Sequence, residues 1–223
     1  MDVSTPPLWL VSGTIGAGKT ALCRALAGQA RAAGWDVAGL LSPGVFDAGQ
    51  KTAIQVEDLR TGEHRLLASI EPRPGFDLPF GQWHFDRAAL AWGNHVLEHS
   101  LPCDLLVVDE LGPLELLHGQ GFTAAQAALA GGRYRMGIAV VRPALVETFS
   151  SLLPPQRVIA PDRSVGGDDA DRLPDLRAFI SQLDLSADRA GLPGGAVGAL
   201  PAPLLSGDAS LTHIHLPPRL FCL

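Results

Sequence analysis

A glycine-rich segment near the start of the chain has the residue types and the spacing of a phosphate-binding loop. Residues 13–20 spell Gly-Thr-Ile-Gly-Ala-Gly-Lys-Thr, which is the pattern G-x-x-x-x-G-K-T. A phosphate chain needs several converging backbone N–H donors, and glycines permit the tight turn that presents them. We expect Lys19 to bring positive charge to the β- and γ-phosphates and the Thr20 hydroxyl to bind Mg²⁺. The residues expected to surround the phosphates are Gly13, Thr14, Ile15, Gly16, Ala17, Gly18, Lys19 and Thr20.

A pair of acidic residues follows an apolar run in the middle of the chain. Residues 105–108 are Leu-Leu-Val-Val, typical of a buried parallel strand, and Asp109 and Glu110 come directly after them. The carboxyl ends of parallel strands meet at one edge of a sheet, so both acids are expected beside the glycine loop. We expect Asp109 to hold Mg²⁺, and Glu110 to orient or deprotonate an attacking water.

The elements that must position these residues alternate between strand and helix over the first 160 residues. The sequence predicts strands over residues 8–11, 37–41, 105–108, 138–141 and 157–160. It predicts helices over residues 19–33, 87–99, 122–130 and 143–152, the second of them N-capped by Asp86. This alternation indicates an α/β fold, with a mainly parallel sheet and helices on both faces.

Two further segments interrupt that alternation. Residues 54–59 and 64–67 flank Thr61-Gly62, which predicts a small β-hairpin beside the main sheet. Residues 71–81 contain three prolines and two glycines, which predicts a loop. We expect the α/β domain to cover residues 1–165, a C-terminal helix region to cover 166–184, and a linker-like tail to cover 185–223.

Composition and charge exclude several classes of protein. The chain has 223 residues, 47% of them hydrophobic, which is too apolar for a disordered chain, and a net charge of −6. This acidity argues against a general nucleic-acid binder, which carries a basic field. The three cysteines are far apart and fit a reducing compartment. With no signal peptide and no long apolar run, we expect a cytoplasmic protein that does not bind membranes.

The residues around Asp109 bring a specific resemblance. Residues 109–116 spell Asp-Glu-Leu-Gly-Pro-Leu-Glu-Leu, which resembles the D-E-[IL]-G-P-[ML]-E-L signature of a small P-loop nucleoside-triphosphatase family, that of the cancer-related nucleoside-triphosphatase of animals. Gly16, as the middle glycine of the loop, is also similar, and the resemblance covers residues 8–165. It implies a three-layer P-loop fold in which another strand separates the loop strand from the Asp109 strand. It also implies Mg²⁺-dependent hydrolysis of nucleoside triphosphates to diphosphates, with loose base preference.

The chain departs from the pattern of that family at three places. The family shows a Glu-Val-Arg segment where this chain has Pro43-Gly44-Val45-Phe46, and an Arg-x-Gly-Phe where it has residues 51–54, Lys-Thr-Ala-Ile. After the last strand the family carries an Asn-Arg pair, whereas this chain has Asp162-Arg163. None of these positions belongs to the phosphate-binding loop or to the acidic pair.

Arginines are candidates for stabilising the charge that develops on a transferred phosphoryl group. Arg142 follows the strand over residues 138–141 and is expected to emerge at the active-site edge, where it would join Lys19 and Glu110 as a catalytic residue. Arg163 is expected near the base. We expect Arg24 to form a surface salt bridge and Glu115 to cap the start of a helix.

Two other functions remain open from the sequence. A nucleotide or small-molecule kinase could hold an acceptor phosphate with Arg60, Arg65, Arg73 and Arg87. A nucleotide-gated interaction protein would bind nucleotide with little turnover and meet a partner through its tail. Glu110 favours hydrolysis over the kinase, because a hydrolase needs a base for water whereas a kinase must keep water out. Low intrinsic activity that rises only with a partner, or on truncation of the tail, would favour the interaction protein.

Histidines suggest metal sites at two places. Residues 95–99 match H-x-x-E-H, a zinc-protease pattern, but no further ligand is identifiable, so His95, Glu98 and His99 are interpreted as exposed helix residues. His213, His215 and Cys222 stand close together near the end of the chain, where a frayed terminus is the expected state.

Overall fold

The computed structural model describes residues 6–161, which form strands, α-helices and one 3₁₀ turn. The strands are β1 (Leu8–Ser12), β2 (Val37–Leu41), β3 (Gly44–Asp47), β4 (Gln50–Asp58), β5 (His64–Ser69), β6 (Leu78–Phe80), β7 (Trp83–Phe85), β8 (Cys103–Leu111), β9 (Tyr134–Val141) and β10 (Arg157–Ile159). The helices are α1 (Lys19–Ala32), α2 (Arg87–Glu98), α3 (Pro113–Leu116), α4 (Ala124–Ala130) and α5 (Val146–Leu152), with the 3₁₀ turn η1 (Pro143–Leu145). The predicted helix region 166–184, the tail, Arg163, His213, His215 and Cys222 lie outside the described residues.

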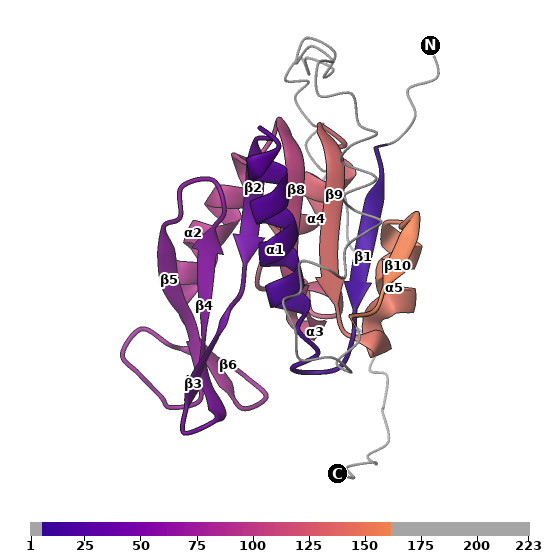
Figure 1. The fold of residues 1–223 in the computed structure, drawn as a ribbon. Coiled ribbons are helices and arrows are strands. Elements are labelled where there is room, and N and C mark those ends of the chain that lie inside the picture. The colour runs from indigo at the N-terminus through magenta and orange to yellow at the C-terminus, as the bar shows by residue number, and fades with distance from the viewer. Residues whose placement is uncertain (1–5, 162–223) are drawn as a thin grey trace, which may run out of the picture. The chain divides into compact units, whose positions relative to one another are not determined.

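All ten strands belong to one sheet of mixed direction. Its order is β10-β1-β9-β8-β2-β4-β5-β7-β6, with β3 paired to β4 (Figure 1). The first five strands of that order run parallel, and the pairing becomes antiparallel from β2 to β4 onwards. The expected intervening strand is confirmed, because β9 lies between β1 and β8. Helices cover both faces, as the alternation predicts: α1 lies on one face, and α2 and α4 lie on the other (Figure 1).

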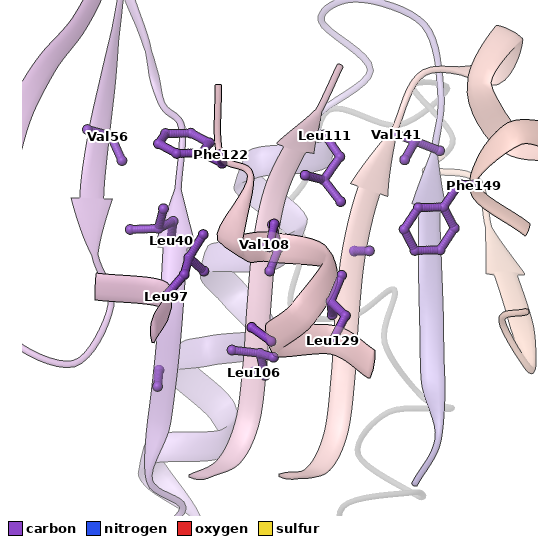
Figure 2. Packing of buried hydrophobic residues seen from close by; sticks show 14 of the residues in the cluster. Leu40, Val56, Leu97, Leu106, Val108, Leu111, Phe122, Leu129, Val141 and Phe149 are labelled. Atoms are coloured by element: carbon purple, nitrogen blue, oxygen red, sulfur yellow. The ribbon is translucent and has the colours of Figure 1, made fainter. Parts of the chain in front are cut away.

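The alternating side chains of the central strands supply two separate cores. In β1, Leu8 and Leu10 face one cluster, while Trp9 and Val11 face the other. The cluster on the α1 side holds Leu26 and its neighbours from that helix. Figure 2 shows the opposite cluster, which packs residues of α2, α4 and α5 against the sheet. Because parallel strands are covered on both faces, they read as continuous apolar runs in the sequence.

A close backbone approach between β2 and β8 requires glycine at position 39. Gly39 has φ 105°, and a Cβ atom placed there would lie 1.9 Å from the carbonyl oxygen of Val107. Only glycine adopts this φ without strain, and only glycine leaves room for that carbonyl. Gly39 therefore sets the contact between β2 and β8, the strand that carries Asp109.

The predicted hairpin is larger than expected and is not separate from the main sheet. β4 and β5 form it, but β4 also pairs with β2 through Leu40↔Asp58 and Leu41↔Glu57, so the hairpin continues the sheet. β3, β7 and β6 extend this antiparallel half. The loop predicted over residues 71–81 is confirmed for residues 71–77, but residues 78–80 form β6, because Pro79 is tolerated in a strand at the end of a sheet.

Several predicted element boundaries are confirmed and others move. Asp86 caps α2, accepting a hydrogen bond of 2.8 Å from the Ala88 amide. The predicted helix over 122–130 begins only at Ala124. The predicted strand over 105–108 extends in both directions as β8, whose register with β9 shifts between Val108 and Leu111, so the acidic pair stands within the strand. Within residues 6–161, no helix is long and apolar enough to cross a membrane.

Candidate active site

The glycine loop connects the carboxyl end of β1 to the first turn of α1. Gly16 and Gly18 have φ values of 71° and 88°, the left-handed region that glycine adopts without strain. The Lys19 ammonium donates hydrogen bonds of 2.8 Å to the carbonyl oxygens of Gly13 and Thr14. These bonds hold the lysine against its own loop. The loop and the start of α1 lie at the lower edge of the sheet in Figure 1.

Asp109 stands at the same edge with its carboxylate buried. The residue is 1% exposed, and its Oδ2 accepts a hydrogen bond of 3.0 Å from the Ser42 amide. The Ser42 hydroxyl donates to the Asp109 carbonyl oxygen at 3.1 Å, and the Thr20 side chain also hydrogen-bonds to the carboxylate. Burial raises the pKa of Asp109 to about 6, against the opposing effect of the Ser42 and Thr20 hydrogen bonds.

Glu110 is held between two basic side chains. Arg142 Nη2 donates to Glu110 Oε1 at 2.9 Å, and Lys51 Nζ lies 4.0 Å from Glu110 Oε2. The Glu110 backbone has φ 66°, which is uncommon for a residue other than glycine. Such conformations persist where the surrounding structure imposes them, and they cluster at functional sites. Arg142 follows β9, and its predicted position at this edge is therefore confirmed.

Charges of both signs meet at Lys19. Burial lowers the pKa of Lys19, and the nearby carboxylates of Glu110 and Asp109 act in the opposite direction. The positive charges of Arg142 and Lys51 add to the lowering. Three cations and two carboxylates thus lie within electrostatic range of one another, an arrangement that an incoming polyphosphate would strongly affect.

Glu115 anchors the segment that follows the acidic pair. Its Oε2 accepts a hydrogen bond of 2.9 Å from the Gly112 amide at the start of α3, and its Oε1 accepts one of 3.1 Å from the Phe122 amide. The predicted capping role is confirmed. The second hydrogen bond connects Phe122, just before α4, to the same carboxylate. Burial raises the pKa of Glu115 despite these hydrogen bonds.

A cavity of about 720 Å³ joins these residues to an apolar wall. Its polar end is formed by the glycine loop, Lys19, Thr20, Asp109, Glu110 and Arg142. Its other end comes from the antiparallel half of the sheet and from the residues after β8. The apolar side chains lining it are Phe46, Ile54, Leu67, Phe80, Trp83, Phe85, Leu114 and Phe122. The tips of β3 and β6 lie beyond the same edge of the sheet as the loop (Figure 1).

The chemistry of the donor groups fits a magnesium ion. Thr20 offers a hydroxyl oxygen, and Asp109 offers a carboxylate whose affinity for a proton is raised by burial. Hard oxygen donors of this kind, together with phosphate oxygens, are the ligands that Mg²⁺ takes in phosphate-binding sites. A divalent cation would also compensate the cost of burying the Asp109 charge.

Two residues of the site were not predicted from the sequence. Ser42, which holds Asp109, follows directly after β2, so its place at the carboxyl end of a parallel strand was the available signal. Lys51 reaches Glu110 from β4, whose pairing with β2 the sequence did not reveal. The available signal for Lys51 is its rarity, since it is one of two lysines in the chain.

The other arginine predictions have different outcomes. Arg24 forms the expected surface salt bridge, with Arg24 Nη2 2.7 Å from Glu57 Oε2. The guanidinium of Arg60 pairs with Asp36 at 3.0 Å and donates to the carbonyl oxygen of Pro102, beside the start of β8. Arg65 pairs with Glu63 and Arg87 with Asp77. Arg60, Arg65 and Arg87 do not line the cavity at the glycine loop.

The histidines of α2 are exposed, as the sequence interpretation expects. His95, Glu98 and His99 have ligand atoms within 4.8 Å of one another and lie at the end of the helix. A ring nitrogen of His99 lies 2.8 Å from the carbonyl oxygen of His95, and so takes part in closing the helix end.

The sequence matches proteins named nucleoside-triphosphatase. A relative from Thermococcus kodakarensis, nucleoside-triphosphatase THEP1, is 29% identical over 147 residues, covering 64% of this chain and 79% of that protein. The relative of the same name from Methanosarcina acetivorans is 29% identical over 117 residues, covering 52% and 65%. The chain spans 56% of the relative of that name from Korarchaeum cryptofilum. It therefore spans less than two thirds of the length of some relatives.

Two solved structures share the fold. The solution structure of a human cancer-related nucleoside triphosphatase matches with a TM-score of 0.56 at 23% identity, over 82% of this chain and 100% of that one. The crystal structure of THEP1 from Aquifex aeolicus matches with a TM-score of 0.57 at 16% identity, over 79% and 99%. A family model described as NTPase matches residues 9–154, which are most of the chain and include every site residue described above. The chain therefore belongs to this NTPase family.

Proposed function

We propose that the chain hydrolyses nucleoside triphosphates to diphosphates and phosphate, with Mg²⁺ as cofactor and with loose base preference. The observation that carries this proposal is the placement of Glu110, a carboxylate held by Arg142 at the edge where the glycine loop ends. Loose base preference is supported by the sequence, which contains no Asn-Lys-x-Asp segment of the kind that selects guanine.

Phosphate binding falls to the loop and to Lys19. Backbone amides of residues 14–19 donate to the phosphate oxygens, with the N-terminal end of α1 adding its positive dipole. Lys19 exchanges its bonds to the carbonyls of Gly13 and Thr14 for bonds to the β- and γ-phosphates. The carboxylates of Glu110 and Asp109 raise the pKa of Lys19 against the lowering by burial, and so favour its charged form.

Thr20 and Asp109 would hold the magnesium ion. When bound, it neutralises the charge that develops on the β- and γ-phosphate oxygens. Asp109 must lose its proton for this role, and with a pKa of about 6 it does so at neutral pH. The Ser42 amide fixes Oδ2 of this carboxylate, to which the Thr20 side chain also hydrogen-bonds.

Glu110 acts on water. Its carboxylate accepts a hydrogen bond from the attacking water and takes its proton as the bond to the γ-phosphorus forms and the bond to the β–γ bridging oxygen breaks. Arg142 sets the direction of that carboxylate through Oε1, and its guanidinium adds positive charge on the same side. A cation in that place is worth about 10³-fold or more in rate in related reactions.

Phosphate release from ATP, GTP, CTP and UTP, measured with Mg²⁺ and no acceptor, tests this proposal. We expect Glu110→Gln to bind nucleotide within about threefold of the wild type while its turnover falls by about 10²-fold or more. Lys19→Ala is expected to lose both binding and turnover. Glu63→Gln is the matched control, because Glu63 pairs with Arg65 in the β4–β5 turn and contributes nothing to the cavity. Undiminished turnover of Glu110→Gln would refute the assignment of Glu110.

The apolar wall favours a second candidate, transfer of the phosphoryl group to an organic acceptor. A cavity of about 720 Å³ exceeds what a water molecule needs, and its aromatic lining resembles that of small-molecule sites. The same measurement separates the two candidates. Steady phosphate release without acceptor supports hydrolysis, whereas tight nucleotide binding without release supports transfer to an acceptor.

A further inference from the structure

Lysine is used in this chain at two positions only. The chain contains 17 lysine and arginine residues, and Lys19 and Lys51 are the only lysines among them. Both line the same cavity. Lys19 belongs to the phosphate-binding motif, where a compact ammonium is required, whereas surface ion pairs such as Arg24–Glu57 and Arg60–Asp36 use arginine. Both lysine ammonium groups of the chain are thus available to one cavity.

The contacts of Lys51 leave its ammonium available. Lys51 Nζ lies 4.0 Å from Glu110 Oε2 and 5.6 Å from the centre of the Trp83 ring, and it makes no hydrogen bond to the rest of residues 6–161. Exposed or half-exposed ion pairs of this length contribute little to stability. Arg142, in contrast, donates a bond of 2.9 Å to the other oxygen of Glu110. Glu110 thus keeps a strong partner if Lys51 moves away.

Neighbouring residues shape the path of the Lys51 side chain. A Cβ atom at Gly44 would lie 2.8 Å from Lys51 Cε, so any larger residue at position 44 would displace the lysine stem. The ammonium lies over the Trp83 ring, whose negative face attracts a cation. This attraction does not require the N–H groups to point in a fixed direction. Together they hold the charge over the cavity while its three N–H groups remain free to turn.

The position of Lys51 relative to the phosphates follows from the fixed groups. Under the proposed function, Asp109 and Thr20 would hold a metal ion that supplies positive charge to the phosphates, and Glu110 would hold the water that attacks the γ-phosphorus. Lys51 approaches Glu110 from β4. In the order of the sheet, β8 and β2 lie between β4 and the side that holds β1, the strand before the glycine loop. The positive charge of Lys51 also lowers the pKa of Lys19. An anion between the two lysines would remove their repulsion, and the γ-phosphate is the group placed to do so.

We propose that Lys51 binds the γ-phosphate and is the residue by which the site distinguishes a triphosphate from a diphosphate. On nucleotide binding, its ammonium leaves Glu110 and donates to a γ-phosphate oxygen, opposite Lys19. Glu110, still oriented by Arg142, is then free on Oε2 to accept from water. This inference rests on the proposed function for the identity of the γ-phosphate end, and it assigns Lys51 a contact that a diphosphate cannot make.

Selective labelling of lysine with carbon-13 at the ε position tests the contact directly, because the full chain then gives only two lysine signals. The Lys51 signal is assigned from its loss in Lys51→Met. We expect Mg²⁺ with the non-hydrolysable β,γ-imido analogue of ATP to shift both signals, and Mg²⁺ with ADP to shift the Lys19 signal alone. The proposal is overturned if the chemical shift of the Lys51 signal does not change with the analogue, or changes equally with ADP.

Binding affinities provide a second readout that does not depend on hydrolysis. We expect Lys51→Met to lower the ratio of imido-analogue affinity to ADP affinity by about tenfold, the worth of a charge-assisted hydrogen bond, and Lys51→Arg to recover part of it. Arg24→Met is the matched control, because it removes a basic side chain that pairs with Glu57 and does not line the cavity. Melting curves of each variant confirm that it is folded.

The two proposals fail in different ways. An unchanged affinity ratio in Lys51→Met, with turnover lost in Glu110→Gln, overturns the role of Lys51 and leaves hydrolysis intact. A changed ratio, with turnover unaffected in Glu110→Gln, supports the γ-phosphate contact and refutes the assignment of Glu110.

Discussion

At the scale of single residues, Asp109 shows how the demands of stability and of chemistry differ. Its carboxylate is buried among strands, with the Ser42 amide and the Thr20 side chain as partners. The pKa rises from 3.8 to about 6, which corresponds to a cost of about 3 kcal/mol for keeping the charge in the folded, metal-free protein. Under the proposed function this cost is offset when the carboxylate binds a cation, which an amide would hold poorly.

We therefore expect Asp109→Asn to stabilise the nucleotide-free protein. Since the folded pKa exceeds the unfolded one, the stabilising contribution of Asp109 is fully present below about pH 4 and is lost as the pH rises through about 6. The melting temperature of Asp109→Asn should match that of the wild type near pH 4 and exceed it by about 5 °C or more at pH 7.5. Mg²⁺-nucleotide binding should weaken in the same variant. A difference in melting temperature that does not change with pH would contradict this account.

The sequence was informative about single residues wherever a local pattern places them. Lys19 and Thr20 begin the helix after the loop that follows β1, and Asp109 and Glu110 lie near the carboxyl end of β8, so their meeting at one edge follows from parallel strand direction. Lys51 could not be placed in this way. It stands in the second residue of an antiparallel strand, and its approach to Glu110 depends on how β4 pairs with β2 and on sheet twist.

At the scale of elements, the contact between β2 and β8 is the one that carries Ser42 to Asp109. Gly39 lies against the Val107 carbonyl in the middle of this parallel pair. Because a Cβ atom there would overlap a backbone oxygen, neither a rotamer change nor a small shift of one side chain can relieve the contact.

Two glycine substitutions test this element. Gly39→Ala is expected to destabilise the protein by about 3 kcal/mol or more, or to prevent folding, because steric overlap adds to an unfavourable φ. Gly28→Ala is the matched control: Gly28 is exposed in the middle of α1, and a Cβ atom there meets nothing within 4 Å. That variant should be about 0.5–1 kcal/mol more stable than the wild type, through helix propensity. Chemical denaturation of both variants measures the two effects, and a Gly39→Ala protein of wild-type stability would argue against the close approach.

Sequence patterns predicted the parallel half of the sheet better than the antiparallel half. Continuous apolar runs, a glycine after α1 and an acidic cap before α2 are local signals, and each matches an element of the structure. β6 and β7 are three residues each and are held by pairing with one another and with β5, so their own sequence carries little information. β3 depends in the same way on β4.

At the scale of the whole molecule, the cavity is assembled from segments that are distant along the chain. The loop, β3, β4, β6, β7, β8 and the residue after β9 all contribute to its lining. A nucleotide that binds there contacts several of these segments in the folded state and few of them in the unfolded chain. Binding energy is therefore added to the free energy of unfolding.

We expect Mg²⁺ with a nucleoside triphosphate analogue, at 100 times its dissociation constant, to stabilise the protein by about 2.7 kcal/mol. For a chain of this length that corresponds to a rise of about 5–10 °C in melting temperature. Lys19→Ala should lose most of this rise, and Arg24→Met should retain it, because Arg24 lies outside the cavity. A full rise in Lys19→Ala would indicate that the nucleotide binds elsewhere.

Within residues 6–161, the ladder between the antiparallel and the parallel half of the sheet consists of two residue pairs of β2 and β4. The differences from the family pattern at residues 43–46 and 51–54 fall in this half, whereas the phosphate loop and the acidic pair keep that pattern. The wall of the cavity, Lys51 included, can therefore differ between relatives while the glycine loop and the acidic pair stay the same. The same architecture offers protein engineers a modular graft, in which the β3–β4 ribbon of a relative would replace Lys51 and its part of the cavity wall while the glycine loop, Asp109 and Glu110 stay unaltered.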